Sequence, residues 1–552
     1  MAYAWLCLLL TAPIDGPIDT VVVCPEAFRA ELAPWIAHRT AQGHRFAMVS
    51  SAGSADAVRG RVRRIAAEHP VRFLVLVGDA APPEVRDLAG RARTVPTHYA
   101  QAVVNVRFGS EPQIATDNWY ADLDGDRIPE LATGRLTSDS PAELRAMIAK
   151  ILAYEACDDF GPWRRQVHFV AGLGGFGTVP DAVLEAAART LITSGIPASY
   201  ATTMTYGSWQ SPYCPDPRQF DRVTCERLNQ GGLFWVYLGH GDQRAVDMVR
   251  VPGGTYRIFS TTDAERLACR HGAPIACLLA CYSGAFDQPR DCLAEVMLKG
   301  EGGPVAVLCG SRVTMPYGMA VLGAELMDAC FARRPETLGE LILEAKRSAA
   351  RPDDSDRFRA ALDAVGKTFA WATGGDAQAE RLEHLELFHL LGDPLLRLPH
   401  PRTIDVRVTQ SGQAAERIQV EGHSPIAGHC TVELVVRRDR LTFRPPARGH
   451  FDPTRLDEYS RTYRLANEPR LASLELGRVA GAFRAELDIP PQSRGACHVR
   501  VFVEGDRDCA AGAADLRLDG MATSPTHERS AAVREARTRA PADGRRAKPT
   551  AE

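Results

Sequence analysis

Short, continuous runs of aliphatic and β-branched residues alternate with longer amphipathic segments in the first part of this chain. The runs include Thr20–Cys24 (TVVVC), Phe46–Ser50 (FAMVS) and Phe73–Ala80 (FLVLVGDA), and helix-length segments at 26–42 and 55–67 separate them. Apolar runs of this length, bounded by turn residues, are typical of parallel strands that are buried on both faces. The pattern therefore predicts a doubly wound α/β fold.

The same alternation restarts after a helical pattern at 141–156. The later apolar runs are QVHFVAG at 166–172, GGLFWVYLGHG at 231–241, APIACLLACYSG at 273–284 and GGPVAVLCGS at 302–311. Helical patterns then continue to about Leu391. We expect two tandem α/β subdomains with mostly parallel sheets, at 19–156 and 157–400.

Beyond Pro401 the pattern changes to alternating polar and apolar residues, with no clear helix. Segments such as TIDVRVTQ (403–410), CTVELVVRR (430–438) and CHVRVFVEG (497–505) have the period of half-buried strands. They predict a small β-sandwich at 401–519. Residues 520–552 have almost no large apolar side chain, so we expect a disordered tail there.

Charge and hydropathy exclude several classes of function. The formal net charge is −3, and no long run of Lys and Arg precedes the tail, so we expect no nucleic-acid partner. Within the N-terminal segment 1–18, the apolar stretch Ala2–Leu10 is much shorter than the roughly 20 residues that span a bilayer. It reads either as a weak signal peptide or as a buried segment, and we expect no membrane span.

Two loops each follow a predicted buried strand and carry a reactive side chain between small residues. His240 stands between two glycines after the strand at 234–238, and Cys281 follows the strand at 275–280. In doubly wound sheets, ligands bind at the carboxyl ends of the strands. Their separation of 41 positions (281 − 240) leaves room for one crossover helix, so adjacent strands would bring imidazole and thiol together.

Each of these two signals has a simpler explanation when taken alone. A His between glycines is more often a turn residue, and a Cys at the end of an apolar strand is usually a small buried hydrophobe. The occurrence of both, on successive strands, favours a nucleophile and its base. The other thirteen cysteines, such as Cys277, Cys292 and Cys309, are expected to be core residues.

Two further motifs leave alternatives open. The sequence GLGGFG at Gly172–Gly177 fits a dinucleotide-binding pattern, but no acidic residue follows at the required distance, which favours an ordinary loop. The segment ADLDGDRIPE places Asp122, Asp124, Asp126 and Glu130 around a Gly turn. These carboxylates suit a structural Ca²⁺ and equally suit a solvated acidic turn.

The residues around these loops resemble the gingipain family of cysteine peptidases, whose fold is similar to that of caspases. The resemblance rests on YLGHGDQ at 237–243 and LLACYSGAFDQPRDCLAEVML at 278–298. It extends to the start of the chain at 20–50, to TDNWYADLDGDRIPELATGRL at 116–136 and to LLGDPLLRL at 390–398. The likeness covers about residues 19–400, and the family often adds an immunoglobulin-like domain, which matches the β-rich segment.

The resemblance implies a cysteine endopeptidase with His240 and Cys281 as its catalytic dyad. The expected oxyanion donors are the backbone N–H groups of Gly241 and Cys281. The implied partner is a protein or peptide substrate, and the implied chemistry needs no cofactor. Members of the family are commonly exported, which favours a secreted or cell-envelope location. A third residue that orients His240 is not identifiable from the sequence.

The resemblance also implies a substrate pocket. Asp117 matches the position at which arginine-specific members carry the acidic residue that binds the side chain before the cleaved bond. Ser311 and Arg312 lie in a loop expected to wall the same pocket, and an inward Arg312 would neutralise Asp117. The alternative for the whole chain is a catalytically silent relative that serves as a binding or scaffolding module. The presence of both His240 and Cys281 argues against it.

Overall fold

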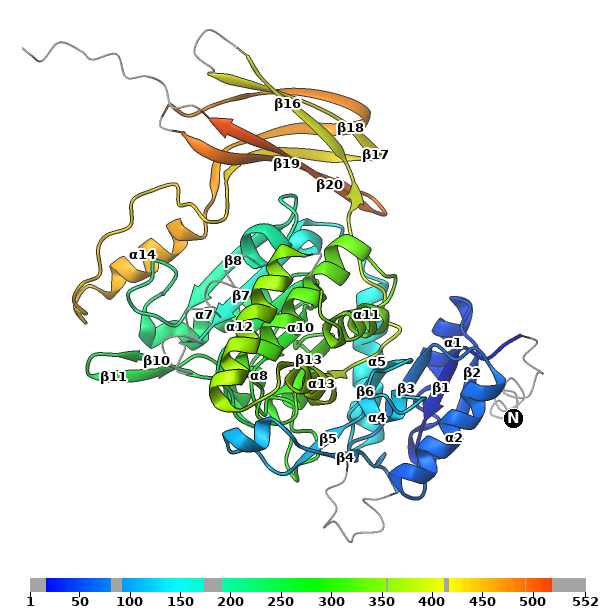
Figure 1. The fold of residues 1–552 in the computed structure, drawn as a ribbon. Coiled ribbons are helices and arrows are strands. Elements are labelled where there is room, and N and C mark those ends of the chain that lie inside the picture. The colour runs from blue at the N-terminus through cyan, green and yellow to red at the C-terminus, as the bar shows by residue number, and fades with distance from the viewer. Residues whose placement is uncertain are drawn as a thin grey trace, which may run out of the picture.

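In the computed structural model, a large α/β unit carries a smaller β domain on one side (Figure 1). The structure describes residues 16–80, 92–172, 191–353, 356–411, 416–491 and 493–518. The N-terminal residues 1–15, most of the glycine-rich motif at 173–177 and the predicted disordered tail lie outside these ranges. Among the described residues, no helix is both long enough and apolar enough to cross a bilayer.

The α/β unit is built on a single ten-stranded sheet with the order β2-β1-β3-β6-β14-β13-β12-β9-β7-β8. The pairing is parallel throughout, except that β14 runs antiparallel to β13. The strands are β1 (Thr20–Val23), β2 (Phe46–Val49), β3 (Phe73–Val77), β6 (Ala132–Leu136), β7 (Gln166–Ala171), β8 (Ala201–Tyr206), β9 (Phe234–Leu238), β12 (Ile275–Leu279), β13 (Ala306–Gly310) and β14 (Phe388–Leu391).

The predicted mixed α/β class is confirmed, but the prediction of two tandem sheets is wrong. Strand β14 lies between β6 and β13 and joins the two halves into one sheet. Its four residues follow directly on a helix and read as the end of a helical pattern. A pairing between Leu391 and Arg135, which lie far apart in the chain, leaves no local trace in the sequence.

The helices cover the sheet in layers. In the N-terminal half, α1 (Ala33–Ala41) and α5 (Pro141–Glu155) pack on the face that carries Val22 and Val75, and α2 (Ala55–Glu68) and α4 (Asn118–Ala121) pack on the face of Val21 and Leu74. The remaining helices of this unit are α7 (Phe220–Asn229), α8 (Thr261–Ala264), α9 (Leu293–Lys299), α10 (Pro316–Asp328), α11 (Leu338–Ala350), α12 (Arg357–Thr373) and α13 (Ala377–Leu387). Helix α5 begins where the sequence predicts it, because Ser140 caps it and Pro141 stands at its first position.

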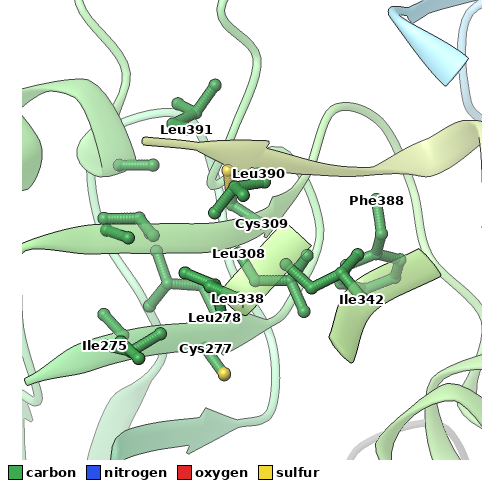
Figure 2. Close-up of a cluster of buried hydrophobic side chains, with 14 of the residues drawn as sticks. Ile275, Cys277, Leu278, Leu308, Cys309, Leu338, Ile342, Phe388, Leu390 and Leu391 are labelled. Atoms are coloured by element: carbon green, nitrogen blue, oxygen red, sulfur yellow. The ribbon is translucent and has the colours of Figure 1, made fainter. Parts of the chain in front are cut away.

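The middle of the sheet is packed by fully apolar side chains. Figure 2 shows Ile275 and Leu278 of β12, Leu308 of β13 and Leu390 of β14 in one cluster with Leu338 and Ile342 of α11. All are almost completely buried. Because burying such side chains contributes about 1.5–3 kcal/mol each, this region holds rigid the strands whose carboxyl ends carry the candidate site.

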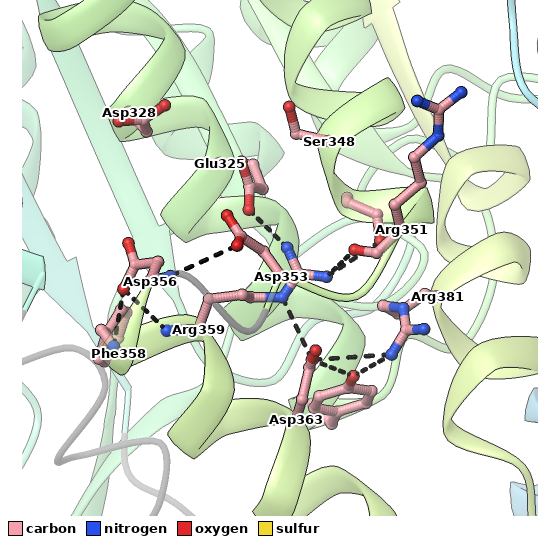
Figure 3. Close-up of polar contacts among 12 residues, drawn as sticks. Glu325, Asp328, Ser348, Arg351, Asp353, Asp356, Phe358, Arg359, Asp363 and Arg381 are labelled. Carbon is pink, nitrogen blue, oxygen red and sulfur yellow. Dashed lines mark hydrogen bonds and ion pairs between the residues drawn. The ribbon is translucent and has the colours of Figure 1, made fainter.

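A buried ionic network ties α10, α12 and α13 together. Figure 3 shows Arg359 of α12 between Glu325 of α10 and Asp363, with Arg381 of α13 on the other side of Asp363. Tyr317, at the start of α10, donates a hydrogen bond of 2.6 Å to Asp363 and accepts one of 2.6 Å from Arg381. The network fixes the start of α10, which follows directly on the loop after β13.

Two short antiparallel hairpins stand outside the main sheet. They are β4 (His98–Gln101) with β5 (Gln113–Thr116), and β10 (Met248–Val251) with β11 (Gly254–Arg257). The sequence pattern did not indicate either hairpin, because the strands have four residues each and little apolar character. Both emerge close to the candidate site described below.

The C-terminal domain is a six-stranded, nearly closed arrangement with its own apolar core, and its strands are antiparallel except for the parallel pair of β15 and β20. Its strands are β15 (Arg402–Thr403), β16 (Asp405–Ser411), β17 (Arg417–Val436), β18 (Arg470–Asp488), β19 (Gly495–Gly505) and β20 (Cys509–Leu518). The expectation of no helix is wrong, because α14 (Leu456–Ala466) lies between β17 and β18. Its strong amphipathic pattern was missed inside a segment that otherwise reads as strands.

Residues 437–469, here called the arm, leave the β domain and pack along the outer edge of the large sheet (Figure 1). The side chain of Asn467 accepts from the N–H of Met204 at 2.7 Å and donates to its carbonyl at 3.0 Å. Strand β8 is the last strand of the sheet, so this amide takes the place of a neighbouring strand. The arm thus covers an edge that would otherwise be open to aggregation.

Candidate active site

His240 and Cys281 lie side by side at the carboxyl edge of the sheet. Strands β9 and β12 are adjacent and parallel, and Leu238 pairs with Leu279 in their register. His240 and Cys281 each follow two residues later, so they occupy matching positions beyond the strand ends. The sequence-based prediction that adjacent strands bring these two residues together is therefore met by the strand register.

Glycines let the two loops approach closely. A side-chain carbon at Gly241 would lie 2.8 Å from the carbonyl oxygen of Cys281 and 2.9 Å from the Cβ of Ala280. Gly239 has a φ of 152°, and a side-chain carbon there would lie 2.7 Å from the hydroxyl of Tyr237. A larger residue at position 241 would push the His240 loop away from Cys281, and one at position 239 would collide with the Tyr237 hydroxyl.

The hydroxyl of Tyr237 stabilises the His240 loop by hydrogen bonds. It donates a 2.9 Å hydrogen bond to the carbonyl of His240 and accepts one of 3.2 Å from the N–H of Asp247. The Asp247 N–H also reaches the His240 carbonyl at 3.2 Å. Burial raises the pKa of Tyr237 far above its usual value, so the phenol keeps its proton and remains a donor. The backbone of His240 is thus held by two hydrogen bonds to its carbonyl oxygen.

The Cys281 sulfur is surrounded by polar atoms of one residue. The backbone N–H of Thr314 donates to Sγ at 3.3 Å, the Thr314 hydroxyl lies 3.5 Å away, and the Thr314 carbonyl lies 3.6 Å away. Thr314 belongs to the loop after β13, the neighbour of β12. The next residue after the cysteine, Tyr282, has a φ of 54°, a left-handed conformation that is uncommon outside glycine and is often found at functional sites.

Two backbone N–H groups lie close together between the two loops. The N–H groups of Gly241 and Cys281 donate to no acceptor among the described residues. A side-chain carbon on Gly241 would lie 3.7 Å from the Cys281 nitrogen, so the two strand-end loops bring these groups to the same place. An arrangement of a thiol, an imidazole and two free backbone donors can perform acyl transfer.

Ser311 and Arg312 are buried and hold a neighbouring hairpin in place. The Ser311 hydroxyl donates to the carbonyl of Ala115 at 2.9 Å. Arg312 does point inward, but it makes two hydrogen bonds, of 2.9 and 2.6 Å, to Asp287. The expectation that an inward Arg312 would neutralise Asp117 is wrong, because the charge of Arg312 is paired with Asp287 instead.

Asp117 is also buried, and its carboxylate is already paired. Arg135 donates to it at 2.7 and 2.8 Å, and the Thr97 hydroxyl donates at 3.0 Å. Burial alone would raise the pKa of Asp117, but the charge and hydrogen bonds of Arg135 outweigh that effect and lower it. A cavity beside it has a volume of about 20 Å³ and is lined by residues such as Lys346 and His389, without Cys281 or His240. Such a space holds about one water molecule, not a substrate side chain.

A different carboxylate, Glu111, lies beside the residue that follows Cys281. The hydroxyl of Tyr282 donates to Glu111 Oε2 at 2.8 Å, and Arg312 Nε lies 3.7 Å from the same oxygen. The Glu111 side chain is 48% exposed, and its Oε1 accepts from none of the described residues. Since Arg312 is neutralised by Asp287, the three charged groups together carry a net charge of −1 (two carboxylates and one guanidinium).

The acidic loop after α4 gathers three of its four predicted ligands. Oxygen atoms of Asp122, Asp124 and Glu130 lie within 4.8 Å of one another, and Asp126 is not part of the group. Burial and the three nearby aspartates raise the pKa of Glu130. Arg59 donates to the carbonyl of Asp122 and lies 3.7 Å from its carboxylate, which offsets part of the negative charge.

Sequence reasoning missed Thr314, Tyr237, Tyr282 and Glu111. Thr314 could have been found, because it follows an apolar strand next to the strand of Cys281 and so lies at the same edge. Tyr237 has the pattern of an ordinary strand residue, and Glu111 lies in a loop 170 positions before Cys281 (281 − 111). Neither carries a signal that is visible in one sequence.

A family model described as "Peptidase family C25" matches residues 14–399. Among curated proteins, Lys-gingipain of Porphyromonas gingivalis is 21% identical over 433 residues, which cover 75% of this chain and 23% of that protein. Lys-gingipain W83 of the same organism is 22% identical over 437 residues, with the same shares. The chain therefore spans less than a quarter of the length of the curated relatives that it matches.

Among solved structures, the fold is similar to that of the Arg-specific cysteine proteinase gingipain R, with a TM-score of 0.52 and 16% identity. The match covers 91% of this chain and 98% of that one. A complex of the pro- and mature domains of RgpB from Porphyromonas gingivalis matches with a TM-score of 0.50 and 15% identity. At this identity the likeness concerns the fold alone.

Proposed function

The chain belongs to peptidase family C25, and from this premise we propose that it is a cysteine endopeptidase with Cys281 as nucleophile and His240 as acid and base. The observation that carries the proposal is the register of β9 and β12, which places these two residues at matching positions beyond adjacent strand ends. A catalytically silent scaffold has no physical need for this pairing, nor for glycines that bring the two loops into contact.

In the first half of the reaction, His240 takes the proton of Cys281, and the thiolate attacks the carbonyl carbon of the substrate. A C–S bond forms, and the electron pair of the carbonyl moves to its oxygen. The backbone N–H groups of Gly241 and Cys281 donate to that oxygen. When the C–N bond breaks, His240 gives its proton to the leaving amine, which leaves an acyl-enzyme.

In the second half, His240 takes a proton from water, and the resulting hydroxide attacks the acyl carbon. The same two N–H groups stabilise the second oxyanion. Collapse of this intermediate breaks the C–S bond and returns the proton to the sulfur. Every step uses side chains or backbone groups of this chain and needs no cofactor.

We propose a preference for a basic residue before the cleaved bond. The relatives support this through their names, which describe one as a Lys-gingipain and another as Arg-specific. With Asp117 paired to Arg135, the carboxylate that suits the role is Glu111, because it is half-exposed, adjacent to Tyr282 and part of a cluster with a net negative charge. A carboxylate recognises a guanidinium or ammonium group by charge-assisted hydrogen bonds.

Two structural features complete the proposal. We infer that the loop of Asp122, Asp124 and Glu130 binds Ca²⁺, since a cation would offset the burial and the neighbouring negative charges that raise the pKa of Glu130. We infer also that the C-terminal domain is an immunoglobulin-like sandwich, in which β17 pairs with β16 along its first half and with β19 along its second.

The test is peptide hydrolysis by the purified wild type, by Cys281→Ala, by His240→Ala and by the double variant. Each single variant should lose several orders of magnitude in kcat/KM. The double variant should lose little more, because residues that act as a unit are not additive. Melting temperatures close to wild type would show that folding is intact. Hydrolysis that survives in Cys281→Ala would rule out the mechanism.

A further inference from the structure

Thr314 is placed against the sulfur of Cys281 by several independent contacts. Its side chain is 1% exposed, and its methyl group would clash with any side chain at position 310, which is glycine. The backbone N–H of the next residue, Met315, donates to Nε2 of His384 at 2.9 Å. The carbonyl of the previous residue, Val313, accepts from the side-chain amide of Asn105 at 3.1 Å. The position of Thr314 is therefore built into the fold and is not a chance contact.

The hydroxyl of Thr314 has two sulfur atoms within reach. It donates to the thioether sulfur of Met319 at 3.1 Å, and the sulfur of Cys281 lies 3.5 Å away. A thioether is a weak acceptor, whereas a thiolate carries a full negative charge and forms charge-assisted hydrogen bonds. When Cys281 loses its proton, rotation about a single bond redirects the hydroxyl from Met319 to the thiolate. No heavy atom has to move.

The backbone of Thr314 acts in the same direction. Its N–H already points at Sγ, at 3.3 Å, in the arrangement that favours a negative sulfur. Its carbonyl, at 3.6 Å, accepts from the neutral thiol and opposes ionisation, but it is the most distant of the three atoms. Two donors therefore outweigh one more distant acceptor, and the residue as a whole favours the thiolate.

We propose that Thr314 is a further catalytic residue, whose backbone N–H and hydroxyl together form a two-donor cradle for the thiolate of Cys281. The proposal rests on the proposed function, since it assigns the sulfur as the nucleophile. The proton of Cys281 goes to His240 as before, and Thr314 neither gains nor loses a proton. Its hydroxyl changes its acceptor as the thiolate forms, and it returns to Met319 when the sulfur is acylated.

The test compares Thr314→Val, which keeps the shape and removes the hydroxyl, with Thr314→Ser, which keeps the hydroxyl. The readout is the rate of alkylation of Cys281 by iodoacetamide as a function of pH, followed by mass spectrometry of the Cys281 peptide. This reagent needs no substrate pocket. In Thr314→Val we expect the midpoint of the profile to rise by about half to one pH unit. In Thr314→Ser it should stay near the wild-type midpoint.

Two results would overturn the proposal: a Thr314→Val midpoint equal to wild type, or equal shifts in both variants, which would indicate packing alone. If Thr314→Val does not fold, Met319→Leu takes its place. That variant removes the competing acceptor, so the midpoint should fall, and an unchanged midpoint would count against the cradle. Failure of the proposed function is seen separately, as peptide hydrolysis that survives in Cys281→Ala.

Discussion

At the scale of single residues, the charges around Cys281 decide what the site can recognise. Asp117 and Arg312 are both buried, and each is already matched by an internal partner, Arg135 and Asp287 respectively. Removing one member of such a pair leaves an uncompensated buried charge, which typically costs about 3–5 kcal/mol. These residues therefore support the fold of the site, and we propose that the half-exposed Glu111 meets the substrate.

This division predicts different outcomes for two isosteric variants. Glu111→Gln should lower kcat/KM for peptides with Arg or Lys before the cleaved bond by about tenfold or more, because a charge-assisted bond is lost. Its melting temperature should stay near wild type. Asp117→Asn should lower the melting temperature without changing the order of preference. The measurement is a cleavage profile of a peptide library beside thermal melts.

The opposite result would indicate that Asp117 binds the substrate side chain. A preference for basic residues that collapses in Asp117→Asn and persists in Glu111→Gln would contradict the assignment of Glu111 to the substrate pocket. Sequence reasoning chose Asp117 by its place in a motif, and a motif does not reveal that Arg135, 18 residues later (135 − 117), occupies its carboxylate.

At the scale of elements, the acidic loop between α4 and β6 gives a prediction about metal removal. If the loop binds Ca²⁺, EDTA should lower the melting temperature, since a metal at 100 times its dissociation constant stabilises the folded state by about 2.7 kcal/mol. Asp124→Asn should abolish the EDTA effect. Asp126→Asn is the matched control, because Asp126 lies outside the cluster of ligand atoms.

Equal melting of the wild type with and without EDTA, in calcium-containing buffer, would leave the loop as an ordinary acidic turn. The hydrogen bonds within the loop make that outcome physically reasonable. The N–H groups of Gly125 and Arg127 already donate to Asp122, and that of Leu123 donates to Glu130.

Helix α13 gives a prediction about pH. Its Glu380 accepts from the N–H of Gly318 at 2.9 Å, yet burial and the nearby Glu383 raise its pKa to about 7. The folded state thus holds a proton that the unfolded state releases near pH 4.5. The resulting stability is present below about pH 4.5 and is lost as the pH rises to about 7, by roughly 3 kcal/mol in total.

Glu380→Gln removes this titration and keeps an oxygen that accepts from Gly318. Relative to wild type, the variant should therefore gain stability between pH 5 and pH 8, as measured by urea unfolding. Glu68→Gln, an exposed position on α2, is the control and should show no such gain. A difference between Glu380→Gln and wild type that does not change with pH would show that Glu380 is ionised throughout.

Elements were also where the sequence was most informative. The strands at 234–238 and 275–279 and the helices at 55–68 and 141–155 lie close to their predicted bounds, because apolar runs and capping residues are local signals. The family resemblance read from the His240 and Cys281 loops is confirmed by the match over residues 14–399. What could not be predicted is the long-range pairing of β14, the short hairpins β4–β5 and β10–β11, and the residues that they bring to the site.

At the scale of the whole molecule, the arm ties the C-terminal domain to the α/β unit. Arg448 donates to the carbonyls of Trp209, Ser211 and Cys214, and it stacks on Tyr459 at 3.9 Å. A second contact comes from the end of β17, where Glu433 pairs with Arg165 of the α/β unit at 3.2 Å. These contacts couple the two domains at several points.

We therefore expect the chain to unfold by heat in one cooperative transition. Arg448→Ala should lower the free energy of unfolding by about 1–3 kcal/mol, because it leaves backbone carbonyls without a donor. Arg444→Ala, an exposed position in the same arm, is the matched control and should have little effect. Two separate calorimetric transitions in the wild type would contradict the coupling.

The central claim is that one cysteine of 14 is the nucleophile and that His240 activates it. The most direct measurement is covalent labelling with a peptide that carries a thiol-reactive group after an Arg or Lys residue, followed by mass spectrometry of every cysteine. We expect label on Cys281 and on no other cysteine, with a labelling rate that falls by orders of magnitude in His240→Ala. Label on another cysteine, or an equal rate without His240, would contradict the account.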